Sequence, residues 1–314
     1  MGAAPYAAAV GADELFGVVP NFSEGRRPDV VGAIVDALHV HGANVVYAEA
    51  DPDHNRLDTT VLGGADAVVR SAKAGAAKAV ELIDMTQHSG GHPRMGAADV
   101  IPFMPVRGTS MDACIDLARG FGRDLAETLN VPVYLYDRAA LLPERASLAD
   151  VRKGEFEGLR DAVAKGERLP DFGPHAIGRA GATAVGARTP LVAFNVYLDG
   201  TDEEAAKEIA RSVRESGGGL PAVRAIGFAV PERGGIVTVS MNLVDHEVTG
   251  LRTAFDAVTG LADERGMVVT DSEIVGLVPE AALGPGDIEA LRLVGFDEQH
   301  QVLERLLAGR EGAT

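Results

Sequence analysis

Residues 44–62, with the sequence NVVYAEADPDHNRLDTTVL, decide the fold because two apolar runs flank a charged turn. Runs rich in Val, Tyr, Thr and Leu between turn-forming residues are typical of β-strands. We therefore expect strands over residues 44–49 and 57–62. The seven residues between them are dense in turn formers and charge.

Helical patterns lie on both sides of this pair of strands. Before it, Asp29 begins a run with apolar residues at helical spacing, and Gly42 is well placed to end it. After it, residues 65–82 form an alanine-rich helical pattern. Apolar runs at 15–20 and 100–106 complete the order β-α-β-β-α-β, which is the ferredoxin-like arrangement.

The chain from residue 191 onward repeats the order β-α-β-β-α-β. Residues 137–188, with scattered Pro, Gly and Arg and a helical stretch near 148–164, are interpreted as a linker or a binding loop. The other predicted elements are helices at about 109–129, 201–215 (capped by Thr201) and 247–265, and strands at 131–136, 191–198, 222–230, 236–243, 267–269 and 274–278. Residues 1–13 are expected to be a frayed leader and 301–314 a frayed helical tail.

The sequence therefore predicts an α/β (α+β) protein of two ferredoxin-like βαββαβ subdomains. The N-terminal subdomain is expected over residues 1–188 and the C-terminal one over 189–314. A length of 314 residues exceeds the usual limit of a single hydrophobic core, which also favours two domains. Two such subdomains are expected to leave a ligand cleft between them.

Composition excludes several classes of partner. A formal net charge of −17 makes nucleic acid and anionic membranes unfavourable partners. The single Cys114 permits no intrachain disulfide, is expected to be a small buried residue, and suits a reducing compartment. No signal peptide or membrane-spanning run is found in the sequence. We expect a cytoplasmic protein.

The loop Gly90-Gly91-His92-Pro93-Arg94-Met95-Gly96 carries the main candidate for chemistry. It directly precedes an apolar run, so a rigid strand would support the histidine. Pro93 keeps His92 out of the helical region of backbone space, and an imidazole titrates near neutrality, which suits general acid–base catalysis. From these residues alone, a surface histidine without a chemical role is an equally good interpretation.

Other candidate sites are weaker. Arg26, Arg56 and Arg94 are each expected in a loop, and a guanidinium group binds carboxylates well. A metal site would use His54, His88 and His92 with Asp51 and Asp53, but their spacing fits no zinc template. No phosphate-binding loop or Gly-x-Ser-x-Gly motif occurs. Phe172 could stack on a flat ligand or anchor its loop.

Several motifs, in order and covering nearly the whole chain, resemble the formiminotransferase domain of the glutamate formimidoyltransferase family. They are VPNFSEGR (19–26), LIDM (82–85), HPRMG (92–96), NVPVYLY (130–136), PDFGP (170–174), AFN (193–195), AIG (225–227) and EIVGLVP (273–279). The resemblance implies that folate binds between two subdomains. It also implies transfer of a formimino group from N-formimino-L-glutamate to tetrahydrofolate, with His92 as general acid–base.

The resemblance also implies particular site residues. Glu49 is the candidate carboxylate for orienting His92, with Asp51 and Asp53 as nearby alternatives. The expected substrate-binding residues are Asn21, Ser23, Glu24, Arg26, Arg56, Arg94, Lys165, Leu169, Pro170, Asp171, Phe172, Gly173 and Pro174, of which the stretch from Lys165 to Pro174 matches a folate-binding segment. Gly91 stands where the family has a glutamate, and Glu49 where it has an aspartate.

The expected co-substrate is tetrahydrofolate, without a metal, and the expected assembly is a homodimer acting on small molecules. Two alternatives remain open. A related enzyme would move a formyl group between glutamate and folate. A non-catalytic protein of this fold would sense folate or an amino acid as a dimer.

Overall fold

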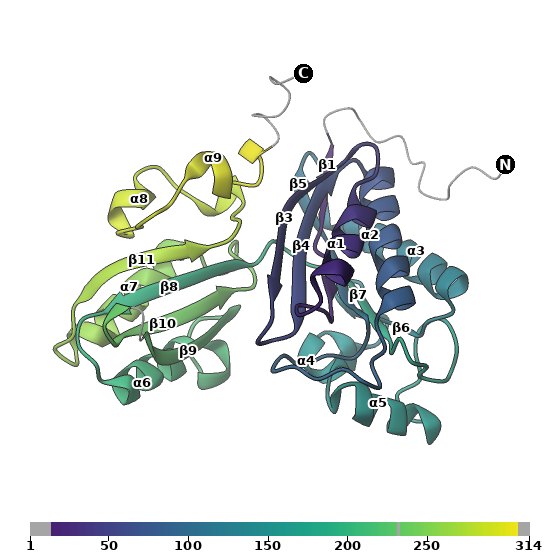
Figure 1. Cartoon of the computed structure of the whole chain (residues 1–314). Coiled ribbons are helices and arrows are strands. Elements are labelled where there is room, and N and C mark those ends of the chain that lie inside the picture. The colour runs from purple at the N-terminus through teal and green to yellow at the C-terminus, as the bar shows by residue number, and fades with distance from the viewer. Residues whose placement is uncertain (1–13, 231–232, 307–314) are drawn as a thin grey trace. The chain divides into compact units, whose positions relative to one another are not determined.

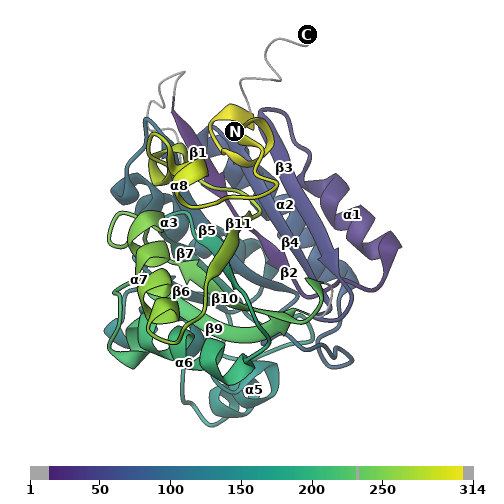
Figure 2. The same cartoon turned by 90° about the vertical axis from the view of Figure 1, so that its left-hand side faces the viewer.

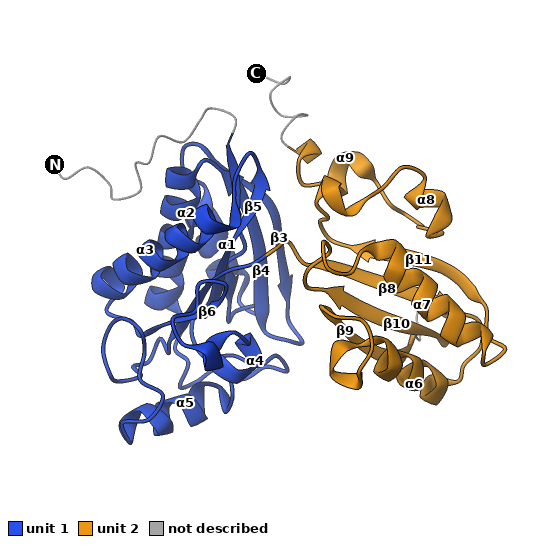
Figure 3. Ribbon diagram, turned by 180° about the vertical axis from the view of Figure 1, so that it is seen from behind, with its two compact units in different colours: residues 1–188 blue, residues 189–314 orange. Residues whose placement is uncertain are grey.

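The computed structural model of the protein describes residues 14–230 and 233–306. The predicted leader over 1–13 and the end of the predicted tail, 307–314, lie outside the described residues. The chain divides into two compact units, residues 1–188 and 189–314 (Figure 3). A mixed α/β architecture with one sheet in each unit confirms the predicted α/β class. The ferredoxin-like arrangement of each unit stays a prediction.

Unit 1 is built on a seven-stranded sheet (Figure 1). Its strands are β1 (Leu15–Val18), β2 (Asn21–Phe22), β3 (Ala43–Asp51), β4 (Arg56–Gly63), β5 (Ala98–Arg107), β6 (Val133–Asp137) and β7 (Thr183–Ala187). Across the sheet, β3 is followed by β4, by β1 and β2 together, and then by β5, β7 and β6. Pairs from β3 to β5 are antiparallel, whereas β5, β7 and β6 run parallel.

Three long helices cover one face of this sheet (Figure 1). They are α1 (Pro28–Leu38), α2 (Ala65–Leu82) and α3 (Met111–Leu129), and two shorter helices, α4 (Leu148–Val151) and α5 (Glu155–Ala164), follow β6. In α1, Val30, Ile34 and Leu38 recur every fourth residue and are all buried, as an amphipathic helix requires. Gly75 lets α2 approach α1 closely, since a Cβ there would lie 2.6 Å from Cδ2 of Leu38. Cys114 of α3 is buried, as predicted.

The structure corrects the interpretation of residues 137–188 as a linker or loop. Residues 183–187, TAVGA, form β7, a fully buried strand inside the sheet between β5 and β6. The strand is short and built of small residues, so it lacks the bulky, alternating pattern by which strands are predicted. Small residues are needed because Gly186 lies against the Tyr136 ring, 2.5 Å from where its Cβ would be. The helical stretch is interrupted at Gly154, whose φ is +80°.

Unit 2 has a four-stranded antiparallel sheet in the order β11-β8-β10-β9. Its elements are β8 (Val192–Leu198), α6 (Glu203–Val213), β9 (Val223–Val230), β10 (Ile236–Leu243), α7 (Leu251–Asp263) and β11 (Val269–Val275), followed by α8 (Asp287–Ala290) and α9 (Glu298–Gln301). Helices α6 and α7 pack together against this sheet (Figure 2).

Two local predictions in unit 2 were wrong. The cap of α6 is Asp202 rather than Thr201, because the Asp202 side chain accepts a hydrogen bond from the Ala205 N–H at 3.0 Å. Instead of two strands at 267–269 and 274–278, the structure has one continuous strand, β11, over Val269–Val275. None of the helices in the described part of the chain combines the length and apolar character needed to cross a bilayer.

Candidate functional site

The loop that carries His92 is fixed at its end. The Met95 N–H donates to the Asp99 carboxylate at 2.7 Å, and the Ala97 N–H donates to the Ala180 carbonyl at 2.8 Å. The Ala182 N–H donates in turn to the Met95 carbonyl at 2.9 Å. A Cβ on Gly96 would lie 2.0 Å from the Ala182 carbonyl oxygen, so only glycine allows this contact. Residues 180–182, which directly precede β7, therefore hold the loop in place.

His92 is half-buried, and its orientation is set by the backbone. Its Nδ1 lies 2.7 Å from the Pro93 carbonyl oxygen. Because a carbonyl only accepts hydrogen bonds, Nδ1 is the protonated nitrogen of the neutral ring, and the lone pair is on Nε2. Burial and the positive charges of Arg56 and Arg152 lower the pKa of His92. The imidazole is thus neutral near pH 7 and able to accept a proton at Nε2.

A buried charge cluster lies behind the histidine. Asp99 of β5 is fully buried, and its carboxylate bonds Nη1 of Arg56 at 2.9 Å and Nη2 of Arg152 at 2.5 Å. Burial alone would raise the pKa of Asp99, but the two guanidinium groups and the Met95 N–H hold it below its usual value. The half-exposed Asp58 also pairs with Arg56, at 3.2 Å, but at His92 the effect of the two guanidinium groups on the pKa exceeds that of Asp99. Residues around Arg152 had been interpreted only as a helical stretch.

Two of the three arginines predicted to clamp substrate carboxylates are engaged inside the protein. Arg56 begins strand β4 rather than lying in a loop, and it bonds Asp99, Asp58 and Asn21. Arg94 is buried and pairs with Glu155 at 2.6 Å and with both oxygens of Glu157. These pairs occupy the guanidinium groups inside the protein, and the roles of Arg56 and Arg94 in substrate binding stay predictions.

Arg26 differs because it is exposed. Its guanidinium donates to the backbone carbonyls of Pro52 at 2.7 Å and Ser89 at 3.1 Å. It therefore joins the turn before β4 to the histidine loop. A carboxylate ligand at Arg26 would compete with these neutral acceptors, so its role in binding stays a prediction.

The motif residues before Arg26 form internal contacts. Asn21 accepts from Arg56, and the buried Ser23 hydroxyl donates to the Gly96 carbonyl at 2.8 Å. The buried Glu24 carboxylate accepts from the N–H groups of Arg26 and Arg27, each at 2.9 Å, and from the Arg27 side chain. Asn21 and Ser23 support the charge cluster and the loop, and Glu24 closes the turn before α1.

Glu49 is not the hydrogen-bond partner of His92. It is exposed on β3 and accepts a hydrogen bond from Tyr47 of the same strand. The partner of the His92 ring is the Pro93 carbonyl. Asp51, one of the alternatives, instead pairs with Nδ1 of His54, and the rings of His54 and His92 lie with centroids 6.2 Å apart.

The predicted folate segment lies along the edge strand β6. The Phe172 carbonyl accepts from the Val133 N–H at 2.9 Å, and Arg123 lies over the Phe172 ring at 5.2 Å. Asp171 accepts from the Leu135 N–H at 2.7 Å and pairs with Arg145. Phe172 thus anchors the segment against the core, the second of its two predicted roles. In the rest of the segment, Lys165, Leu169 and Gly173 are exposed, and Pro170 and Pro174 are half-buried.

A hollow of about 430 Å³ lies beside the histidine loop. Its walls include two residues with no predicted binding role, Asn55 and His88. Asn55 bonds the Gly25 N–H and the Ser89 carbonyl, each at 2.9 Å. Burial lowers the pKa of His88, which bonds the Asn55 carbonyl at 3.3 Å. In the sequence, only its position directly before Arg56 indicates a role for Asn55. The full lining is Glu24, Arg26, Arg27, Asn55, Leu82, Ile83, Asp84, Gln87, His88 and Ser89.

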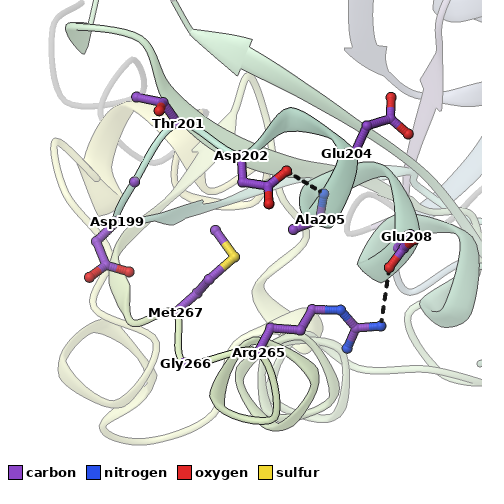
Figure 4. A pocket seen from close by; sticks show the side chains of 10 residues that line it. Asp199, Thr201, Asp202, Glu204, Ala205, Glu208, Arg265, Gly266 and Met267 are labelled. Atoms are coloured by element: carbon purple, nitrogen blue, oxygen red, sulfur yellow. Dashed lines mark hydrogen bonds and ion pairs between the residues drawn. The ribbon is translucent and has the colours of Figure 1, made fainter.

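A second hollow, of about 600 Å³, lies in unit 2 beside the start of α6 (Figure 4). Four of its ten lining residues are acidic, but these have structural partners. Asp199 accepts from the Val268 N–H, Asp202 caps α6, and Glu208 lies 3.7 Å from Arg265. Within the described ranges, no group of three or more His, Cys, Asp or Glu side chains is arranged to hold a metal ion.

Comparison with known proteins identifies the family. Residues 15–188 match the N-terminal subdomain of the formiminotransferase domain, and residues 193–301 match the formiminotransferase domain. The chain belongs to the formiminotransferase family. The resemblance predicted from the motifs is confirmed.

The family relatives include proteins of two lengths. A glutamate formimidoyltransferase of Thermoplasma acidophilum is 43% identical over 290 residues, which cover 91% of this chain and 95% of that protein. A glutamate formimidoyltransferase of Streptococcus pyogenes serotype M1 is 39% identical, covering 93% and 98%. A formimidoyltransferase-cyclodeaminase of Rattus norvegicus is 42% identical over 95% of this chain but only 57% of its own length.

Proposed function

We propose that this protein transfers the formimino group from N-formimino-L-glutamate to N5 of tetrahydrofolate, giving 5-formiminotetrahydrofolate and L-glutamate. Two relatives named glutamate formimidoyltransferase match it over nearly their whole length. The observation that carries the chemistry is the His92 ring, held through Nδ1 by a backbone carbonyl with its Nε2 lone pair available. Among the described residues, Nε2 has no hydrogen-bond partner.

The reaction needs a base first and an acid later. Tetrahydrofolate N5 attacks the amidine carbon, and N5 must lose its proton as the new bond forms. The resulting tetrahedral intermediate then expels the glutamate amine, which leaves readily only when protonated. A neutral imidazole suits the first step, because the low pKa of His92 keeps Nε2 unprotonated at pH 7. Holding both substrates in one site supplies much of the remaining rate.

The binding assignments accompany this proposal. We assign the exposed Arg26 to a substrate carboxylate and the segment from Lys165 to Pro174 to the folate. Folate is a co-substrate, and no step requires a metal. The protein is proposed to act in the cytoplasm as a homodimer on these two small molecules, without nucleic acid or membrane, in histidine degradation and one-carbon metabolism.

The direct test is transfer activity with purified protein and both substrates, following glutamate release and 5-formiminotetrahydrofolate formation. His92→Ala is expected to lower kcat by about 10²–10⁴-fold, the usual contribution of a positioned acid–base group. His41→Gln, at an exposed histidine of the same unit, serves as the control. Near-normal turnover of His92→Ala would contradict the assignment.

Two further arms test the alternatives. Turnover with N-formylglutamate but not with the formimino compound would identify a formyl transferase. Folate binding without any product from the wild type would identify a sensor protein.

A further inference from the structure

A second imidazole stands beside His92 in a contrasting environment. The His54 ring lies edge-on to the His92 ring, with 6.2 Å between centroids and 78° between planes. Its Nδ1 is paired with the Asp51 carboxylate. The other Asp51 oxygen accepts from the N–H groups of Asp53 at 2.8 Å and His54 at 3.0 Å. Hydrogen bonds from the backbone and side chain of His54 lower the pKa of Asp51, so this carboxylate is ionised.

The turn that carries His54 is joined to the loop that carries His92. The Gly91 N–H donates to the Asp53 carbonyl at 3.3 Å. Arg26 bonds the carbonyls of Pro52 and Ser89, one on each segment. The Asn55 side chain also donates to the Ser89 carbonyl, at 2.9 Å. Two direct hydrogen bonds and the bridge through Arg26 therefore set the spacing of the two rings.

The two rings have opposite electrostatic surroundings. His92 is held by a neutral carbonyl and faces Arg56 of β4 and Arg152 after α4, with Asp99 of β5 between them. His54 is paired through Nδ1 with a carboxylate, the arrangement by which a carboxylate orients an imidazole and stabilises the imidazolium that forms during catalysis. Pairs of titratable groups in such opposed environments divide the acid and base roles of a reaction.

We propose that His54, oriented by Asp51, is a second catalytic residue of this site: the acid that protonates the leaving amine, while His92 accepts the proton of N5. This inference rests on the proposed function. It assigns to two side chains the two proton transfers that a single imidazole would otherwise make in turn.

The steps balance as follows. As the bond between N5 and the carbon of the protonated amidine forms, the C=N π pair moves to the terminal nitrogen and the N5 proton moves to Nε2 of His92. The lone pair of the terminal nitrogen then re-forms the C=N bond as the bond to the glutamate nitrogen breaks. The electron pair of the broken bond stays on the glutamate nitrogen, which takes the proton from Nε2 of His54. Afterwards His92 loses one proton to solvent and His54 gains one from it, so the protein returns to its starting state. The His54 side chain is 55% exposed, which permits this exchange.

The test compares His54→Gln and His54→Ala with the wild type at saturating concentrations of both substrates. We expect kcat to fall by about 10²-fold or more, with KM nearly unchanged, because only the acid is removed. In a bell-shaped kcat–pH profile the alkaline limb belongs to the essential acid and the acid limb to the essential base. The alkaline limb should therefore disappear in both variants, while the acid limb remains. Added imidazole should restore kcat to His54→Ala, since the site is open to solvent.

Unit 2 provides a matched control. Asp297 and His300 have the same three-residue spacing, and the His300 Nδ1 lies 2.8 Å from the Asp297 carboxylate. His300→Ala should leave kcat and its pH profile unchanged, with no effect of imidazole. Asp51→Asn should lower kcat less than His54→Gln does, because the ring remains but loses its orientation.

The outcomes separate the two claims. An active wild type with His54→Gln within twofold of its kcat, or with an unchanged alkaline limb, overturns the role of His54 alone. A wild type without transfer activity overturns the proposed function, and the inference falls with it. Loss of kcat in His54→Ala that imidazole does not relieve, with the alkaline limb retained, would mean a purely structural role and would also overturn it.

Discussion

Replacing Asp99 by Asn tests the buried charge cluster that the site depends on. The change keeps the shape of the side chain but removes the carboxylate between Arg56 and Arg152, which are only 6% and 13% exposed. Arg152 then loses its carboxylate partner, and Arg56 keeps only the half-exposed Asp58 at 3.2 Å. Removing one partner of a buried ion pair costs about 3–5 kcal/mol of unfolding free energy. For a unit of 188 residues this corresponds to a fall in Tm of about 6–20 °C.

The control removes the same charge at the surface. Asp66 pairs with Arg70 one turn along α2, and both side chains are about half exposed. Exposed pairs contribute at most about 1 kcal/mol, so Asp66→Asn should lower Tm much less. The assay is calorimetric or circular-dichroism melting of the three proteins at pH 7.5. Asp99→Asn within about 2 °C of Asp66→Asn would refute the electrostatic reasoning.

The same variant has a second readout at the histidine. With Asp99 neutral, the charges of Arg56 and Arg152 act on His92 without compensation, so the pKa of His92 should fall further. The acid limb of the kcat/KM–pH profile should therefore move to lower pH. A move to higher pH would show that the cluster does not act on His92 as a net positive charge.

Other expectations concern packing and pH. Gly96→Ala should destabilise the protein by about 3 kcal/mol or more in urea unfolding, because its Cβ would meet the Ala182 backbone. Gly32→Ala in α1 is the control, because a Cβ there meets nothing within 4 Å. It should raise the free energy of unfolding by about 0.5–1 kcal/mol. Similar free energies of unfolding for the two variants would contradict the close contact between Gly96 and Ala182. Burial lowers the folded-state pKa of His88 and His92, so below pH of about 6.5 the unfolded chain binds more protons. The contribution of the two neutral histidines to the free energy of unfolding should thus be lost as pH falls from about 6.5 to their folded-state pKa. His88→Gln should make the free energy of unfolding depend less steeply on pH in this range.

Much of the fold follows from local pattern in the sequence. The helix predicted at 65–82 has those bounds as α2, because small and apolar residues recur at helical spacing along one buried face, which continues past Gly75. Strand β7 was missed because a strand of small residues buried on both faces carries no alternation. Its place in the sheet depends on neighbours far away in the sequence.

The part of the site that a single loop forms could be predicted from the sequence. The part that depends on ion pairs between distant residues could not. The tight loop around His92 indicated a held histidine, which the structure shows. Glu157, which lies 63 positions from Arg94, removes that arginine from the open site, and no local signal indicated this contact. Asp51 and His54 lie three residues apart in the sequence. Which side chain each of them contacts depends on the conformation of the turn, and the sequence alone does not predict it.

The position of β7 also bears on the order in which the protein becomes active during synthesis. Residues 180–182, which hold the histidine loop, and β7, which lies between β5 and β6, are the last part of unit 1 to be made. Until they leave the ribosome, β5 and β6 have no partner at the positions that β7 will fill, and His92 has no fixed loop. The nascent chain must therefore keep an unfilled gap in its sheet for the time needed to add more than forty residues after β6. The sheet of unit 1 and the loop of His92 are then completed in one late step, when a single short strand enters the sheet.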